Sequence, residues 1–268
     1  VSGASVGALF LGGVVPGLLM AVALMLAVHF VAAKRNLPRG EKIALQAYPR
    51  ILLRGILPLT LPVVLLGGIY TGIFTPTEAA SVAALYALFL ASIIYRALSW
   101  RRLYEILVES SKASASVTLI IASAFVINYA FTAENVPGLV AAWLTGMELS
   151  PLGFLLLVNV LFLVLGCFLD TSIMLLVLVP ILLPTAKLLG IDLVHLGVVL
   201  AVNMMIGLVT PPFGMLLFVI NALAGVSLKG MIREAWLFIA VLLVALVLMT
   251  VFPQIVLWLP HQMGYGGT

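Results

Sequence analysis

The chain has 268 residues, of which 64% are hydrophobic and 8% are charged, with a formal net charge of +4. Soluble domains average about 45–50% apolar and about 25% charged residues, so a soluble fold of this size could not bury this much apolar surface. Apolar runs of about 20 residues cross the bilayer as helices, whereas barrel strands are about 10 residues long and alternate in polarity. The composition therefore predicts an all-α membrane protein with several spans, whose basic excess marks cytoplasmic loops and not nucleic-acid binding.

The first predicted span covers residues 8–33, and the polar loop that follows, residues 34–54, has a large excess of Lys and Arg. By the positive-inside rule this loop is expected in the cytoplasm. The polar stretch of residues 96–113 is basic as well, so two spans, residues 55–74 and 77–95, are predicted between the loops. The basic residues concerned are Lys34, Arg35, Arg39, Lys42, Arg50, Arg54, Arg96, Arg101, Arg102 and Lys112.

Residues 114–132 are predicted to cross outward, because the segment of residues 133–149 carries acidic residues and no Lys or Arg. Residues 150–190 then return the chain to the outer side. They do so either as two full spans or as a re-entrant hairpin with Asp170 at its tip, and the loop charges fit both alternatives. The last predicted span, residues 235–259, follows a short basic loop and leaves the C-terminus outside.

The apolar run of residues 196–224 is interrupted at Thr210–Pro212. A proline in a helix lacks the N–H that would bond the carbonyl four residues earlier, so the two prolines are expected to free the carbonyls of Gly207 and Leu208. Unpaired backbone groups at membrane depth must face protein or a wet cavity. In transporters such broken helices bind Na⁺ through their carbonyls and attract an anion at the next helix N-terminus. The alternative is a kink that serves packing only.

Asp170 is an ionisable residue in an apolar segment, which makes it a candidate functional residue. Thr171 and Ser172 place further oxygen donors beside it, and oxygen ligands suit a hard cation. The alternative is that Asp170 lies at a membrane surface, in a short loop between two spans. The one cysteine, Cys167, lies in an apolar run and indicates neither a disulfide framework nor a zinc site.

Residues 67–78 form a segment rich in Gly and Thr. Thr75 or Thr77 is expected to cap a helix that begins near Glu78, where a carboxylate in the first turn suits the helix dipole. Small residues four positions apart are predicted to allow close helix packing. The pairs are Gly13 with Gly17 and Gly68 with Gly72.

In combination, several stretches of the chain resemble the large membrane subunit of tripartite ATP-independent periplasmic (TRAP) transporters. The resemblance covers essentially the whole chain, and the most specific stretch contains Gly68, Gly72, Thr75, Pro76, Thr77 and Glu78. The other matching stretches are Leu9–Gly17, Gly166–Asp170, Gly190–Asp192, His195–Gly197, Asn203 and Gly207–Gly214.

The resemblance implies an elevator-type secondary transporter built from inverted repeats, with re-entrant hairpins and broken helices. It implies uptake of an organic acid, such as a dicarboxylate or a sugar acid, with Na⁺ as the coupling ion and no other cofactor. It further implies a small membrane subunit and a periplasmic substrate-binding protein as partners. The expected location is the bilayer of a bacterial or archaeal cytoplasmic membrane.

The resemblance also implies which residues form the site. It favours a re-entrant hairpin over residues 150–190 and a broken helix over residues 196–224. The cation ligands are expected to be Asp170, Thr171, Gly207, Thr210 and Pro211. Substrate contacts are predicted at Ser172, Asn203 and Pro212.

The large subunits of this family are considerably longer, and residues 1–268 match them without the first hairpin and the first broken helix. We therefore expect half of an inverted-repeat fold, part of a longer protein, which does not transport alone. Three alternatives remain. One is a related sodium:anion symporter that works without a binding protein, and another is a membrane scaffold. The third is an intramembrane hydrolase that uses Asp170 or Ser5, which lies in a G-x-S-x-G pattern.

Overall fold

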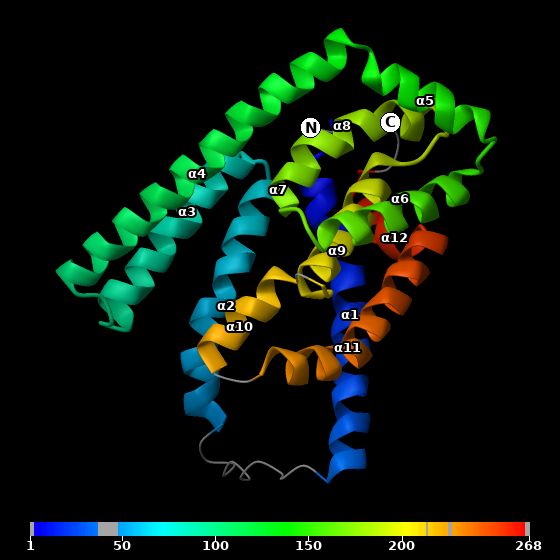
Figure 1. Ribbon diagram of the computed structural model, residues 1–268. Helices are drawn as coiled ribbons and strands as arrows, with labels where there is room; N and C mark the ends of the chain where they lie inside the picture. The colour runs from blue at the N-terminus through cyan, green and yellow to red at the C-terminus, as the bar shows by residue number, and fades with distance from the viewer. Residues whose placement is uncertain (1–2, 37–47, 213, 225–226, 266–268) are drawn as a thin grey trace. The chain divides into compact units, whose positions relative to one another are not determined.

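The computed structural model describes residues 3–36, 48–212, 214–224 and 227–265 (Figure 1). Over these residues the protein is all-α, which confirms the predicted fold class. Five described helices are long and apolar enough to cross a membrane, and three shorter apolar helices accompany them. The chain forms two compact units, one of Val1–Arg35 with Val117–Thr268 and the other of Asn36–Ser116.

In the unit of residues 36–116, helix α2 (Tyr48–Tyr70) packs against α3 (Pro76–Phe89), which continues as the short π-helix η2 (Leu90–Ile94). Beyond the end of α2, Gly72 adopts a left-handed φ of 71°. The phenyl ring of Phe74 lies 2.3 Å from where a Cβ on Gly68 would stand. Gly68 and Gly72 therefore serve the turn after α2, and their role in packing two helices together stays a prediction.

Thr75 caps α3 through a reciprocal pair of hydrogen bonds. Its hydroxyl accepts from the backbone N–H of Glu78 at 3.3 Å, and its own N–H donates to the Glu78 carboxylate at 2.8 Å. Pro76 occupies the first helical position, where its missing N–H costs nothing. The predicted cap is confirmed for Thr75, and it is Thr75 and not Thr77 that makes these bonds.

In the unit of residues 1–35 and 117–268, helix α1 (Val6–Arg35) lies against α11 (Leu228–Val251) and α12 (Gln254–Gln262) (Figure 1). An ion pair of 2.8 Å between Arg35 and Glu234 joins the C-terminal end of α1 to the beginning of α11. Lys229 and Arg233 lie in the same first turns of α11, so basic residues of α1 and α11 gather at this end of the two helices.

A glycine in α1 permits the close packing, but it is not one of the predicted pair. A Cβ on Gly12 would lie 3.1 Å from Val194 and 3.4 Å from Val256. Within the described residues a Cβ on Gly13 or Gly17 would meet nothing within 4 Å, so close packing at these two glycines stays a prediction.

The remaining helices from α5 onward lie around an apolar core formed by α5 to α9, except α10, which packs on α9 and α11. They are α5 (Val136–Gly146), α6 (Pro151–Gly166), α7 (Thr171–Ile173), the π-helix η3 (Met174–Leu178), α8 (Val179–Leu188), α9 (Leu193–Val209) and α10 (Met215–Ala224). Helices α7, η3 and α8 follow one another without interruption, so residues 171–188 form one continuous helical segment. Helix α6 packs along α9, and α5 packs on α8. Fully buried side chains between them include Phe154, Phe162, Met174 and Met204.

The structure differs from the predicted elements at two further places. Residues 235–259, predicted as one span, belong to α11 and α12, which are separated at Phe252 and Pro253 because the proline cannot donate to the carbonyl of Met249. Most of the predicted loop of residues 96–113 is helical, since α4 begins at Trp100 and runs to Ala133. Arg39 and Lys42 lie outside the described residues.

Candidate functional site

Two interruptions of helical structure form the candidate site. The turn of residues 167–170 separates α6 from α7, and a break that begins with Thr210, Pro211 and Pro212 separates α9 from α10. Helix α6 has 16 residues and α9 has 17. At about 1.5 Å per residue, neither reaches across a hydrocarbon core of about 30 Å.

The two interruptions are brought together by a pair of glycines. A Cβ on Gly207 would lie 3.0 Å from both the Cα and the carbonyl carbon of Gly166, so the backbones of α6 and α9 touch with no side chain between them. Just beyond this contact, the thiol of Cys167 lies 3.2 Å from the carbonyl oxygen of Leu163 in α6 and 3.5 Å from the carbonyl oxygen of Pro211, so its one hydrogen is within reach of both acceptors. The structure thus places the turn that carries Asp170 next to the break that carries Pro211.

The helix ends give this region its electrostatic character. Helices α6 and α9 both end here, and helix C-termini carry a partial negative charge on their carbonyls (Figure 1). Two helical segments also start here, one with α7 and the other with α10. Helix N-termini carry partial positive charge on their N–H groups. The same small region therefore offers carbonyl oxygens to a cation and backbone N–H groups to an anion.

Asp170 begins the helix after the turn. Its Oδ1 accepts the backbone N–H of Ser172 at 2.8 Å, so the carboxylate acts as the N-cap of α7. Asp170, Thr171 and Ser172 are all half-buried. The carboxylate thus has a definite structural partner, and its role as a cation ligand stays a prediction.

Thr210 closes the last turn of α9. Its N–H donates to the carbonyl of Gly207 at 3.0 Å, and its hydroxyl donates to the carbonyl of Ile206 at 2.6 Å. The expectation that the proline leaves the Gly207 carbonyl without a donor is therefore wrong, because the N–H of Thr210 replaces the missing one. A carbonyl oxygen has two lone pairs, so the Gly207 carbonyl can accept this bond and still contact a cation.

Pro211 is half-buried and Pro212 is exposed, and the peptide bond between them is cis. Pro212 is the more accessible of the two for a bound molecule. The role of Pro212 as a substrate contact stays a prediction. So does the role of Pro211 as a cation ligand.

Asn203, the remaining predicted substrate contact, is more deeply buried than Ser172 and Pro212. Its side chain is fully buried, and its amide donates to both the backbone carbonyl and the side-chain oxygen of Asn159, at 2.9 and 2.8 Å. The amide of Asn159 in turn donates to the hydroxyl of Thr250 at 2.8 Å. The sequence analysis did not single out Asn159 or Thr250, although an Asn inside an apolar run is a signal for a polar contact between helices.

Ser5 and the motif of residues 68–78 lie away from the two helix breaks in the sequence, and each has a local structural role. Ser5 lies at the start of α1, where its hydroxyl accepts the N–H of Ala8 at 3.4 Å. Over the described part of the chain, no three His, Cys, Asp or Glu side chains are grouped to hold a metal ion. The motif residues 68–78 belong to the other compact unit, where they shape the turn and cap described above.

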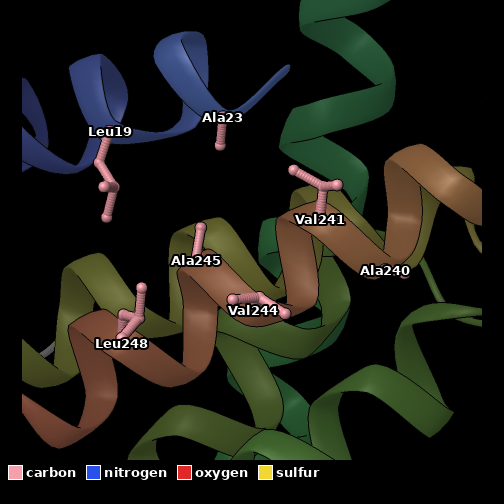
Figure 2. A pocket seen from close by; sticks show the side chains of 7 residues that line it. All are labelled: Leu19, Ala23, Ala240, Val241, Val244, Ala245 and Leu248. Carbon is pink, nitrogen blue, oxygen red and sulfur yellow. The ribbon is translucent and has the colours of Figure 1, made fainter. Parts of the chain in front are cut away.

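An apolar groove of about 260 Å³ lies between α1 and α11 (Figure 2). Aliphatic side chains line it from both helices, so it offers no donor or acceptor to an ion. The lining residues are Leu19, Ala23, Ala240, Val241, Val244, Ala245 and Leu248.

The chain matches proteins of one transporter family over nearly its whole length. Residues 1–255 match the DctM component of the tripartite ATP-independent periplasmic transporter. The C4-dicarboxylate TRAP transporter large permease protein DctM of Pseudomonas aeruginosa is 43% identical over 260 residues, which are 97% of this chain and 61% of that protein. The sialic acid TRAP transporter large permease protein SiaM of Vibrio cholerae is 40% identical over 267 residues, 99% of this chain and 62% of that protein.

The isethionate TRAP transporter permease protein DctMQ of Oleidesulfovibrio alaskensis is 37% identical over 254 residues, which are 94% of this chain and 40% of that protein. The chain thus spans less than two thirds of the length of each of these curated relatives. The five helices of membrane-spanning length among its described residues agree with a multi-pass protein of the bacterial inner membrane. The chain belongs to the DctM family of TRAP transporter permeases, a family of transporters and not of enzymes.

Proposed function

We propose that the chain is part of a membrane permease that takes up an organic acid together with Na⁺. Its partners are a small membrane subunit and a periplasmic binding protein that delivers the substrate. The printed names of the relatives support the substrate class, since C4-dicarboxylates and sialic acid are both organic acids.

The observation that carries the proposal is the meeting of two helix breaks at Gly166 and Gly207. Carbonyl ends of α6 and α9, together with Asp170 and Thr210, supply oxygen ligands for Na⁺, which prefers hard donors. The N-termini of α7 and α10 supply N–H groups for a substrate carboxylate. In a region of low dielectric each ion makes the other's binding more favourable, and this linkage couples substrate to Na⁺.

The length of α6 supports the re-entrant form of residues 150–190. A helix of 16 residues that ends at Gly166 stops inside the hydrocarbon region, and the chain then turns back through α7 and α8. We extend the proposal to an elevator movement, in which the hairpin and the broken helix travel together with their ions. Their direct backbone contact supports such a joint movement.

Two aspartates with the same local role provide a sharp test. Asp170 caps α7, and Asp192 caps α9 through bonds of 2.8 and 3.0 Å to Val194 and His195, at the other end of that helix from the break. Asparagine is as good an N-cap as aspartate, so Asp170→Asn and Asp192→Asn should both fold. Uptake is measured in proteoliposomes that contain the complete subunit and its partners, under an inward Na⁺ gradient.

In this assay, Asp170→Asn should raise the Na⁺ concentration for half-maximal uptake by about tenfold or more, whereas Asp192→Asn should leave it within about twofold. Wild-type uptake that is indifferent to Na⁺ would exclude sodium coupling. Equal effects of the two substitutions would remove Asp170 from the cation site. Omission of the binding protein should abolish uptake, and uptake that continues without it would favour the related symporter.

A further inference from the structure

A polar contact joins α6 to α9 ahead of the glycine crossing. The amide nitrogen of Asn203 donates to the backbone oxygen of Asn159 at 2.9 Å and to its side-chain oxygen at 2.8 Å. Both side chains are buried, with 0% exposure for Asn203 and 5% for Asn159. Because the backbone oxygen of Asn159 can only accept, the Asn203 amide must present its nitrogen to it, which decides the orientation of that amide. We call this contact the Asn159–Asn203 clamp.

The clamp belongs to a chain of bonds that also reaches α11. Asn159 donates to the hydroxyl of Thr250 at 2.8 Å, and that hydroxyl donates to the carbonyl of Leu246 at 2.7 Å. Thr250 has 1% exposure, so it is as deeply buried as the clamp. The network therefore contains two separable links, one from α6 to α9 and one from α6 to α11.

The clamp and the glycine crossing have different physical consequences. Gly166 and Gly207 let the two backbones touch, but two glycines present no side chains that could interlock and prevent sliding. The Asn203 amide binds two atoms of one residue, a contact that is satisfied in one register only. Asn203 lies one turn before Gly207, and Asn159 lies two turns before Gly166. A shift of α6 along α9 at the clamp would therefore displace the two breaks relative to each other.

We propose that the Asn159–Asn203 clamp is a positioning element that holds the turn of residues 167–170 in register with the helix break at residues 210–212. Both side chains are buried, so water does not replace their hydrogen bonds when the clamp is lost. Without these bonds the turn can move away from the break. The consequence for Na⁺ binding rests on the proposed function, whereas the consequence for the geometry of the turn does not.

Cys167 reports on this geometry without any transport measurement. It is the only cysteine among residues 1–268, it is buried, and its thiol lies against the carbonyl of Pro211. The complete subunit is prepared in membranes with any cysteine outside these residues replaced by serine. The rate of modification of Cys167 by N-ethylmaleimide is then measured for each variant.

Asn203→Leu removes the donor of the clamp and keeps the number and branching of the side-chain heavy atoms, although two methyl groups are bulkier than the amide oxygen and nitrogen. Thr250→Val is the matched control, because it removes a buried hydroxyl of the same network but leaves α6 joined to α9. Asn203→Leu should accelerate modification of Cys167 by about tenfold, whereas Thr250→Val should stay within about twofold of wild type although it also lowers stability. Asn159→Ala should be intermediate, since its backbone oxygen remains available to Asn203.

Modification of Asn203→Leu at the wild-type rate would overturn the proposal. So would an equal acceleration in Thr250→Val, which would show a general loosening of the core. If Asn203→Leu does not insert, the comparison of Asn159→Ala with Thr250→Val decides, and equal rates would count against the clamp. The Na⁺ dependence of uptake is measured on the same variants. Wild-type uptake without Na⁺ dependence would refute the proposed function and leave the modification result unaffected.

Discussion

The imidazole Nε2 of His195 lies 2.8 Å from the carbonyl oxygen of Met249, buried between α9 and α11. Met249 stands four residues before Pro253, which has no N–H to donate to that carbonyl. Because a carbonyl oxygen only accepts, Nε2 must carry the hydrogen in this contact. A side chain of α9 therefore supplies the donor that Pro253 cannot give to the Met249 carbonyl at the end of α11.

Replacement of His195 by leucine should destabilise the protein, because the Met249 carbonyl would then be buried without this donor. The expected cost is about 1–2 kcal/mol, which should lower the unfolding temperature in detergent by a few degrees. The exposed His261 on α12 is the control, and His261→Leu should melt within about one degree of wild type. Equal melting of His195→Leu and wild type would show that the bond contributes nothing.

Asn128 makes a similar contact in another part of the same unit. Its side-chain amide donates to the carbonyl of Leu176 at 2.7 Å, and Leu176 stands four residues before Pro180. Asn128→Leu should cost about 1 kcal/mol in the wild-type background and less in a Pro180→Ala background, where the new N–H lets the π-helix η3 revert to α-helical bonding and reach the Leu176 carbonyl. A double-mutant cycle on unfolding free energies measures the difference. The same cost in both backgrounds would contradict this explanation of the bond.

Gly207→Ala should be severe. The new methyl group would stand 3.0 Å from the Cα of Gly166, and only backbone movement could relieve the clash. We expect loss of transport and a cost of about 2–3 kcal/mol, measured by uptake and thermal unfolding of the complete subunit. Gly146→Ala is the control, because a Cβ there meets nothing within 4 Å among the described residues. Normal uptake by Gly207→Ala would mean that the crossing of α6 and α9 is not needed at this distance.

Replacement of both Pro211 and Pro212 by alanine should restore two backbone donors and let α9 continue past Thr210. Insertion and assembly should survive, since a continuous membrane helix satisfies its own backbone. The Na⁺ concentration for half-maximal uptake should rise by about tenfold or more, and Thr210→Ala, which removes one hydroxyl and keeps the break, should be milder. Wild-type sodium dependence in the double variant would make the break a packing kink.

Features that depend on near neighbours in the chain could be predicted from the sequence. The cap at Thr75 needs only the residues up to Glu78, and the end of α9 at Val209 follows from the prolines that come next. The break at Pro253 was missed because a single proline with apolar residues on both sides is also compatible with a kink in one span. The glycine contact of α1 was assigned to Gly13 and not to Gly12, because spacing alone does not show which face a helix buries.

The contacts that assemble the candidate site could not be predicted in this way. The crossing of Gly166 with Gly207 and the bond from Asn159 to Asn203 join residues 41 and 44 positions apart. They depend on which helices lie side by side, and many pairings of apolar helices satisfy the same composition. A polar residue inside an apolar run indicates that a partner is needed, and only the fold shows which one.

The order of residues along the chain matters for how the protein enters the membrane. Asn128 is synthesised before Pro180, and His195 before Pro253. In a chain that inserts from its N-terminus, each donor is already present when the proline-interrupted helix emerges. The opposite order would leave an unbonded carbonyl in lipid until its partner was made, at a cost of several kcal/mol. The later helix of each pair thus depends for its insertion on the earlier one, and a circular permutant that reverses their order should insert poorly.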